Sequence, residues 1–495
     1  MGCEEKSPEQ VDVAVIGGGV VGCAIARELS KYKIGKIVVL EKDSDVSQGA
    51  SKANSGIVHG GYDAKHGTLK SKLSRRGNLM FPQLHRELNF GYRQIGSLVL
   101  AFTDAEMQEL ENLAVNGKLN GVDDLEIIDG EKVRELEPHV SIGVKAALHC
   151  PSAAIVTPYE YCFALAENAI ANGVKLEVNA QVINVEHLRA LRGGNPIYRV
   201  ETKSGKVFDA KYIVNAAGLY ADTIASMAGA SLQYKIMPRK GQFVILEKSQ
   251  GYLANRVIFQ TPTIRWGKGI LVSPTVTGNL LLGPSASEQR DKEERDTDMN
   301  ELAYVAWSAR RSVPHLDTRE HLTTFAGLRA RGPRNDFIIE EDEILKGFIH
   351  VAAIESPGLT SSPAIAELVR DLLFKAGLEV EKRDDFNPIR RHPVHQKQGK
   401  VCDDDERIVC QCEGITEGQI RQAIRQAGIP ITATDSVKWR TRAGMGHCQG
   451  ARCRSEVADI IAQELNDGTE FQDVPKRVQT TTTPNRVQRK GLAKL

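Results

Sequence analysis

Residues 11–22 read Val11-Asp-Val-Ala-Val-Ile-Gly17-Gly-Gly19-Val-Val-Gly22, an apolar run that ends in a glycine-rich turn. A helix-like stretch follows at 23–33, then a second apolar run at 36–40 that closes on Glu41. The succession of strand, glycine turn, helix and strand within about thirty residues is typical of a dinucleotide-binding unit. We therefore predict an α/β fold that begins with a Rossmann-type unit.

The glycines and the acid of this motif each have a physical role. Gly17 permits the tight turn, Gly19 lets a pyrophosphate approach the backbone, and Gly22 lets the helix and the strand pack closely. The N-terminus of the helix then faces the phosphates. Glu41 lies at the end of the second strand, where a carboxylate accepts hydrogen bonds from ribose hydroxyls. This acid favours FAD or NAD over NADP.

Composition limits the remaining classes. The chain has 495 residues, of which 41% are hydrophobic and 26% charged, so it is a globular protein long enough for two or more domains. The net charge of +1 provides no overall field that would attract nucleic acid, and we expect no nucleic-acid partner. The sequence has no secretory signal and no apolar run of about 18 residues, so we expect an intracellular protein without a transmembrane segment.

Two later segments repeat the pattern of a strand followed by a turn of small residues. Residues 211–222 form an apolar strand that runs through Ala217 and Gly218 to Asp222, and residues 347–366 form a strand, a glycine turn and the start of a helix. Three such segments spread over about 360 residues imply a discontinuous nucleotide-binding domain.

Together with the first motif, these segments resemble the glutathione-reductase-type FAD domain, and specifically the D-amino-acid-oxidase-like superfamily of FAD oxidoreductases, over residues 10–375. The resemblance implies that FAD is the cofactor and that residues 355–360 place a helix N-terminus beside the flavin. The implied cofactor-binding residues, in addition to the glycines and Glu41, are Ser51, Asn54, Ser55, Gly56, Val182, Ala217, Gly218, Asp222, Gly358, Leu359 and Thr360.

The same resemblance gives the predicted domain boundaries. The FAD-binding parts are residues 10–90, 151–230 and 326–375. The parts at 91–150 and 231–325 form a mixed-sheet α+β substrate domain, in which 241–246 and 278–283 have the alternation of antiparallel strands. A linker (376–406), a small domain (407–467) and a tail (468–495) follow.

His59 is the base-type side chain in a loop rich in glycine and small polar residues at 51–62. This loop resembles that of alpha-glycerophosphate oxidases and L-2-hydroxyglutarate dehydrogenases, in which the matching histidine lies near the flavin. Oxidation of an alcohol requires a base for the hydroxyl proton, so we predict that His59 is catalytic. In the alternative, His59 hydrogen-bonds the flavin or orders the loop. His350 is a second candidate base, but it lies in an apparently buried strand.

Three arginines occur close together in residues 325–336, and arginine holds carboxylates and phosphates in a fixed bidentate geometry. In the resembled dehydrogenases the arginine that matches Arg329 binds the anion of the substrate, so we predict Arg329 as a catalytic and substrate-binding residue. For Arg331 and Arg334, a solvated surface charge is an equally good interpretation. Additional positive charge in the pocket is predicted from Lys240, Arg265 and Lys268.

These residues predict an FAD enzyme that oxidises a small anionic substrate at a CH–OH centre. The resemblance favours oxidation of sn-glycerol 3-phosphate to dihydroxyacetone phosphate, with hydride transfer to flavin N5. Charge alone fits L-2-hydroxyglutarate and other 2-hydroxy acids equally well. An amino-acid oxidase of the same superfamily and an electron carrier with a vestigial pocket stay open as alternatives.

Four cysteines near the C-terminus form two short pairs, C-x-C and C-x4-C, separated by 35 residues. Four thiolates in this pattern suit zinc or an iron–sulfur cluster, and spacing alone does not choose between them. The segment resembles the bacterioferritin-associated-ferredoxin-like [2Fe-2S] domain, found at the C-terminus of anaerobic-type glycerol-3-phosphate dehydrogenase catalytic subunits. The implied ligands are Cys410, Cys412, Cys448 and Cys453. Such a centre would pass electrons one at a time from the flavin to an acceptor, either a quinone or a redox protein.

The two ends of the chain carry weaker signals. Ala493-Lys494-Leu495 resembles the S-K-L signal that peroxisomal import receptors recognise, which predicts a peroxisomal or glycosomal protein, with the cytoplasm as the alternative. Gly2 and Cys3 suggest an acylated N-terminus, but Lys6 stands where a serine or threonine is expected.

Overall fold

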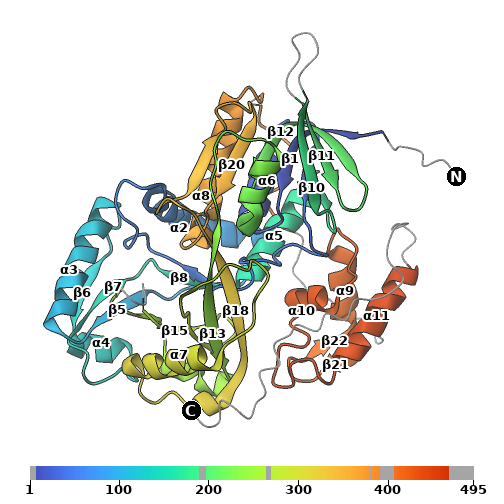
Figure 1. Ribbon diagram of the computed structural model, residues 1–495. Helices are drawn as coiled ribbons and strands as arrows, with labels where there is room; N and C mark the ends of the chain where they lie inside the picture. The colour runs from blue at the N-terminus through green and yellow to red at the C-terminus, as the bar shows by residue number, and fades with distance from the viewer. Residues whose placement is uncertain (1–6, 189–196, 263–268, 380, 391–405, 468–495) are drawn as a thin grey trace.

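The computed structural model describes residues 7–188, 197–262, 269–379, 381–390 and 406–467 (Figure 1). It contains a first sheet covered by helices, a second sheet beside it, and a small helical module at the C-terminal end, drawn in orange and red. The structure has the predicted α/β architecture, with a second, mixed sheet and a small C-terminal module.

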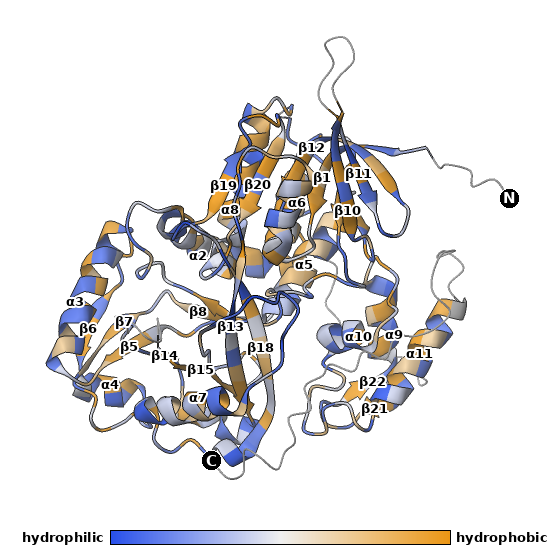
Figure 2. Cartoon of the chain, viewed as in Figure 1, coloured by the Kyte–Doolittle hydropathy of each residue, from blue (hydrophilic) through white to orange (hydrophobic). Residues whose placement is uncertain are grey.

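Within the described residues the first sheet has eight strands. Strands β9, β2, β1, β12 and β20 are parallel, whereas β10, β11 and β19 add antiparallel pairs. Strand β2 and the second half of β1 are buried, as expected for parallel strands covered on both faces. Figure 2 shows this centre as hydrophobic. The strands are β1 (Glu9–Ile16), β2 (Ile37–Leu40), β9 (Lys175–Glu177), β10 (Val182–Leu188), β11 (Ile197–Thr202), β12 (Val207–Asn215), β19 (Ile338–Glu341) and β20 (Phe348–Ala352).

Four helices form the layer on one face of this sheet, and they share one hydrophobic core with it. They are α1 (Val20–Leu29), α2 (Leu69–Leu88), α5 (Pro158–Ala171) and α8 (Gly358–Lys375). Helix α6 (Ala221–Met227) packs with β10 and β11 in a separate core on the opposite face. Because β1 and β2 are parallel, their carboxyl ends and the N-terminus of α1 meet at the same edge of the sheet.

The second sheet is formed by chain segments from both predicted substrate parts, and nine of its strands lie in the described residues. Strands β5 and β14 run parallel, whereas the other pairs are antiparallel. The strands are β5 (Ser97–Ala101), β6 (Glu126–Asp129), β7 (Ala146–Cys150), β13 (Met237–Leu246), β14 (Val257–Gln260), β15 (Leu271–Pro274), β16 (Leu280–Gly283), β17 (Ser287–Glu288) and β18 (His321–Arg331). Strand β18 extends this sheet past the predicted boundary at residue 325.

Helices α3 (Asp104–Leu119), α4 (Gly130–Leu136) and α7 (Met299–Ser312) pack against this sheet. A small three-stranded sheet of β3 (Ile57–Val58), β4 (Tyr92–Gln94) and β8 (Ala154–Val156) lies where the chain passes between the two large sheets. In β13 and β18, the longest antiparallel pair, Arg239 lies opposite Arg329.

The C-terminal module contains β21 (Ile408–Cys410), β22 (Ile415–Thr416), α9 (Glu417–Gln426), α10 (Thr434–Thr441) and α11 (Arg454–Asp467). A capping box at Thr416 and Gln419 begins α9. Buried apolar residues of the three helices form the core of the module, and Ile170 of α5 packs against that core.

No helix in the described part of the chain is long and apolar enough to cross a membrane.

Candidate active site

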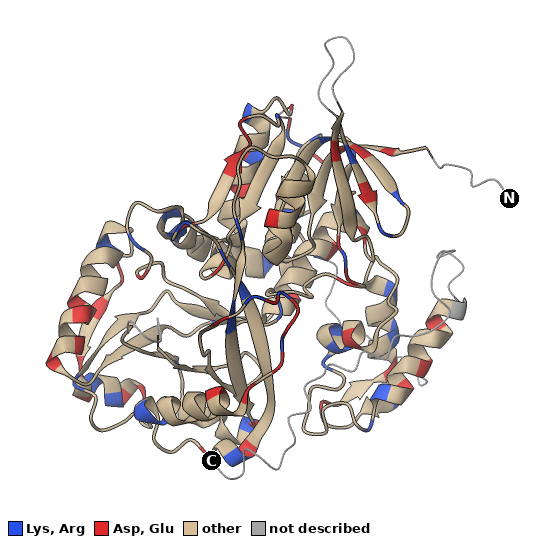
Figure 3. Cartoon of the chain, viewed as in Figure 1, with Lys and Arg blue, Asp and Glu red and all other residues tan. Residues whose placement is uncertain are grey.

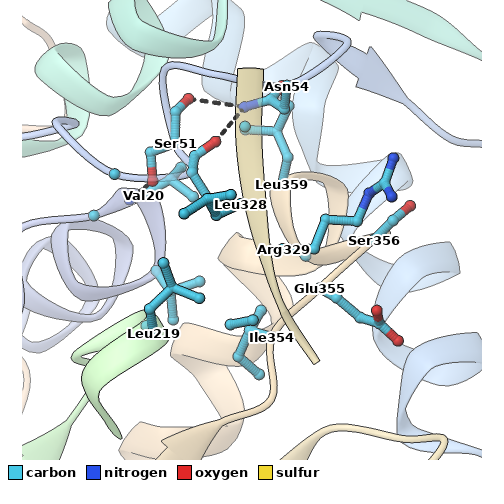
Figure 4. A pocket seen from close by; sticks show the side chains of 18 of the residues that line it. Val20, Ser51, Asn54, Leu219, Leu328, Arg329, Ile354, Glu355, Ser356 and Leu359 are labelled. Carbon is cyan, nitrogen blue, oxygen red and sulfur yellow. Dashed lines mark hydrogen bonds between the residues drawn. The ribbon is translucent and has the colours of Figure 1, made fainter. Parts of the chain in front are cut away.

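A cavity of about 800 Å³ lies between the two large sheets. Its walls come from the glycine-rich turn, the loop at 49–57, the ends of β12 and β20, and strands β13 and β18. Its size is within the range of ligand and cofactor sites. Figure 4 shows residues of these segments around the cavity.

The glycine-rich turn forms one end of the cavity. Gly17 has a φ of +111°, and a Cβ at this position would lie 2.5 Å from the carbonyl oxygen of Ala216. A Cβ on Gly22 would lie 2.0 Å from the carbonyl oxygen of Gly17, so this glycine lets α1 pack against the turn. Gly17 and Gly19 line the cavity, whereas Gly22 has the packing role. The free amides at the start of α1 provide an anion-binding site.

Ser51 completes the N-terminus of α1. Gly19 has no side chain for capping, and the Oγ of Ser51 instead accepts a hydrogen bond of 2.8 Å from the amide of Val20. The loop that begins at Ser51 is therefore attached to the glycine-rich turn.

Glu41 is buried at the end of β2 and lines the cavity. One carboxylate oxygen accepts a hydrogen bond of 2.7 Å from the amide of Gly18, and the other accepts one of 2.9 Å from the amide of Asp43. Burial, and then the nearby charge of Asp43, raise the pKa of Glu41 to about 7. A ligand with hydroxyl donors would favour its ionised form.

The loop at 51–56 is held by the side chain of Asn54. Its Nδ2 donates hydrogen bonds to the carbonyl oxygens of Ala50 and Ser51 at 3.0 and 2.9 Å (Figure 4). Its Oδ1 accepts one of 2.8 Å from the amide of Gly56. Asn54 and Ser55 line the cavity, so a cofactor meets a loop that Asn54 keeps rigid. Gly56 lies outside the lining, because its Cα faces the carbonyl oxygen of Val156.

His59 lies on the cavity wall beside the N-terminus of α8. Its backbone amide donates a hydrogen bond of 3.0 Å to Oγ1 of Thr360, and that hydroxyl donates one of 3.2 Å to the carbonyl oxygen of Ile57. The imidazole ring is 6.0 Å from the ring of Phe259 in β14. His59 therefore lies on the cavity wall at the junction of the two sheets.

The start of α8 forms the neighbouring wall. The cavity is lined by Gly358, Leu359 and Thr360, and also by Val182 of β10 and by Ala217 and Gly218, which follow β12. Glu355 precedes α8 and accepts a hydrogen bond of 2.7 Å from Lys70 of α2.

Two arginines face the cavity from the second sheet. Arg329 of β18 and Arg239 of β13 are partners in the strand register, and both line the cavity. Figure 3 shows basic residues at the end of β13 nearest the first sheet. Burial, and then the charge of Arg239, lower the pKa of Arg329 to about 10. A bound anion would relieve this repulsion, so the pair has the character of an anion site.

Several predicted residues lie elsewhere. Lys240 is not part of the cavity lining and forms an ion pair of 2.6 Å with Glu294, because neighbouring strand residues point to opposite faces. Asp222 also lies outside the lining. Its carboxylate accepts hydrogen bonds of 2.9 Å from the amide of Ile236 and 2.6 Å from Lys292.

His350 is fully buried in β20 and does not line the cavity. Its ring nitrogens lie 3.1 Å from Asp342 and 3.1 Å from the hydroxyl of Tyr234, and burial lowers its pKa. This environment fits a structural histidine. Arg331 and Arg334 are exposed and form ion pairs with glutamates, as solvated charges do, whereas Arg265 and Lys268 lie outside the described residues.

The sequence analysis missed Arg239, Lys70 and Phe259, which line the cavity. A usable signal for Arg239 was its place in a strand next to the one that carries Arg329. No comparable signal marked Lys70 or Phe259, which reach the cavity only through packing between distant segments.

The four cysteines of the C-terminal module form two interacting pairs. A hydrogen bond from Cys453 holds the pKa of Cys410 at about 5, and the same interaction raises the pKa of Cys453. Cys448 interacts with Cys412, which is exposed.

The four thiols lie in one part of the module. In the described residues, no three or more His, Cys, Asp or Glu side chains are placed to hold a single metal ion. Cys410, Cys448 and Cys453 also influence one another electrostatically, so the thiols lie close enough together to serve one shared centre.

Comparison with known proteins agrees with this geometry. The sequence model of the FAD dependent oxidoreductase family matches residues 12–372, and that of the BFD-like [2Fe-2S] binding domain matches residues 408–463. The chain therefore belongs to the FAD dependent oxidoreductases and carries a C-terminal BFD-like [2Fe-2S] binding domain. Its cofactors are FAD and a [2Fe-2S] cluster.

Among individual proteins, the chain is similar to the glycerol 3-phosphate dehydrogenase of Caloramator mitchellensis, at 46% identity over 474 residues, which cover 94% of this chain and 96% of the relative. The solved structure of dithionite-reduced L-alpha-glycerophosphate oxidase from Mycoplasma pneumoniae with FAD bound matches with a TM-score of 0.72 and 32% identity, over 77% of this chain and 98% of that one. The mitochondrial L-2-hydroxyglutarate dehydrogenase of Bos taurus is 27% identical over 75% of this chain and 90% of its own.

Proposed function

We propose that the protein is a dehydrogenase that oxidises sn-glycerol 3-phosphate to dihydroxyacetone phosphate and passes the electrons through its [2Fe-2S] centre. The observation that carries the proposal is one cavity that holds a histidine at the sheet junction and an arginine pair on the opposite sheet. The glycerol 3-phosphate dehydrogenase of Caloramator mitchellensis is similar to this chain over 474 residues, which include both the oxidoreductase part and the cluster module.

In this proposal the residues that line the cavity have distinct roles. Arg329 and Arg239 hold the phosphate, and His59 accepts the proton of the C2 hydroxyl. When bound, the flavin supplies a two-electron acceptor for the hydride and the cluster a one-electron acceptor. The second sheet and Phe259 keep water away from the reacting carbon.

Anaerobic titration of the cofactor-loaded protein tests the substrate. We expect glycerol 3-phosphate to bleach the flavin absorbance and then to produce the spectrum of a reduced cluster. Bleaching by L-2-hydroxyglutarate alone would assign the alternative 2-hydroxy acid. Bleaching by amino acids with release of ammonia would assign C–N chemistry.

We also propose a peroxisomal or glycosomal location, on the basis of Ala493-Lys494-Leu495, which lies outside the described residues. A fluorescent protein that carries residues 468–495 should enter peroxisomes, and deletion of Leu495 should leave it in the cytoplasm. A cytoplasmic signal from both would contradict the proposal.

A further inference from the structure

A buried ion pair joins the cluster module to the FAD-binding part. Arg440 of α10 and Asp45 have side chains that are 5% and 0% exposed. Nη2 of Arg440 donates to Oδ1 of Asp45 at 3.0 Å, and Nη1 donates to Oδ2 of the same carboxylate. The two parallel hydrogen bonds give the pair the bidentate geometry in which arginine binds carboxylates most specifically.

Asp45 belongs to the loop that follows Glu41. Residues of this loop on either side of Asp45, including Asp43 and Ser51, line the cavity. The amide of Ser47 donates a hydrogen bond of 3.0 Å to the carbonyl oxygen of Gly18. Asp45 itself lies behind the loop, outside the lining. The ion pair therefore supports the loop from the side opposite to the cofactor.

Aromatic contacts join the same two parts. The ammonium group of Lys52 lies 5.4 Å from the ring of Trp439, and Lys52 directly follows Ser51, the residue that caps α1. The ring of Trp439 is also 4.7 Å from the ring of Tyr159 at the start of α5. Figure 1 shows α10 beside α5.

Each charge of the ion pair is stabilised in the protein interior by the opposite charge of its partner. Glu167 of α5 lies 3.6 Å from Nε of Arg440 and gives the arginine a second carboxylate. Asp45 is fully buried, and without Arg440 its carboxylate would be an uncompensated charge out of water, which is strongly unfavourable. Movement of the module away from α5, or of the loop away from the glycine-rich turn, would separate the two charges. The docked module and the cofactor-binding conformation of residues 42–51 therefore form one state.

We propose that Arg440 is a positioning residue that keeps residues 42–51 in the FAD-binding conformation, so that docking of the cluster module and binding of FAD are thermodynamically coupled. The coupling is reciprocal, because FAD must then stabilise the docked module as much as the module stabilises bound FAD. The proposal uses the FAD cofactor of the family and is independent of the substrate proposed above.

Release of FAD from the full-length holoprotein tests the first half. Asp45→Asn and Arg440→Lys each remove the bidentate charge pair, and we expect FAD to dissociate about tenfold faster, within the usual range of coupling between sites. The rise of flavin fluorescence after dilution measures the rate. Arg421→Lys is the matched control, because Arg421 pairs with Glu417 and Glu464 inside the module. It should change the rate by less than about twofold.

Hydrogen exchange of residues 434–441 tests the reciprocal half and needs no variant. We expect slower exchange in the wild-type protein with FAD than without it, and loss of this difference in Arg440→Lys. Unchanged FAD release in both interface variants would overturn the proposal, as would equally fast release in Arg421→Lys. If hydrogen exchange of residues 434–441 in the wild-type protein were the same with and without FAD, the proposed coupling would be wrong. If Asp45→Asn fails to fold, Arg440→Lys, which keeps the positive charge, still decides the outcome.

Discussion

At the scale of single residues, burial shifts the pKa values of two ionisable groups in the cavity, and a bound ligand would stabilise their charged forms. Glu41 has its pKa raised to about 7, and Arg329 has its pKa lowered to about 10. In both cases burial is the main cause, and a charge of the same sign nearby adds to it. Each group is therefore poised to gain from a ligand of complementary character, a hydroxyl donor at Glu41 and an anion at Arg329.

The shift of Glu41 predicts a pH dependence. The raised pKa means that the FAD-free folded protein holds a proton that the unfolded chain releases, so this contribution to stability is present below pH 4.5 and is lost as the pH rises through about 7. Ribose hydroxyls favour the carboxylate, so FAD affinity should rise by up to about tenfold between pH 6 and 8.

Fluorescence titration with FAD at several pH values measures this dependence. Glu41→Gln has nearly the same shape but does not ionise, so it should show weaker binding and a flatter pH profile. An equally steep profile in Glu41→Gln would assign the dependence to another group.

His59 gives a prediction about the rate of the chemical step. His59→Ala removes the proposed base, and the rate of flavin reduction by substrate should fall by about 10²- to 10⁴-fold. The FAD absorbance should stay unchanged, because the loop is held by Asn54 and Thr360. Stopped-flow absorbance measures the rate, with the exposed His315→Ala as the control. A rate near that of the wild type would give His59 a structural role.

At the scale of elements, close backbone contacts fix the cavity walls. A Cβ on Gly77 of α2 would lie 2.0 Å from the carbonyl oxygen of Thr360, and one on Gly327 of β18 would lie 1.9 Å from that of Ala53. These glycines let α2 approach the start of α8 and let β18 pass under the loop at 51–56. Elements distant in the sequence are therefore held in direct contact around the cavity.

Gly22→Ala tests the contact between α1 and the glycine-rich turn. The added methyl group forces α1 away from the carbonyl oxygen of Gly17, and overpacking of this kind costs about 1–3 kcal/mol. We expect a lower free energy of unfolding in denaturant and reduced FAD content after purification. Gly143→Ala, where the nearest atom is 3.7 Å away, should change neither. Normal FAD content in Gly22→Ala would show that the turn can relax.

At the scale of the whole molecule, substrate oxidation and electron delivery belong to different parts of the chain. The cavity lies between the two large sheets, and the cysteine pairs lie in a module with its own hydrophobic core. Three side-chain contacts join the oxidoreductase part to this module: Lys248 with Glu413, Glu247 with His447, and Tyr159 with Met445. The two functions should therefore be separable by mutation.

Cys453→Ser tests this separation. Loss of one thiolate should remove the visible spectrum and the iron of the cluster, whereas FAD should stay bound and substrate should still bleach it. Transfer of electrons to a one-electron acceptor should be lost. Analysis of iron and sulfide together with visible spectroscopy measures the outcome. Cys150→Ser, in β7 of the second sheet, is the control. A full iron content in Cys453→Ser would remove Cys453 from the ligand set.

The sequence by itself determined the family, the fold class and the cofactors, because these depend on residues that act within short segments. Gly17, Gly19 and Glu41 belong to one strand–turn–helix–strand unit, and the cysteines fall in two short pairs. The tertiary structure decided which side chains face the cavity. The side chain of Lys240 pairs with Glu294, and that of Asp222 binds the amide of Ile236, so neither lines the cavity. Arg239, in contrast, lines the cavity beside Arg329. The pair of Asp45 and Arg440 joins a loop to a helix 395 residues further along the chain. No local pattern marks such a contact, because its energy exists only once the folded chain has buried both charges together.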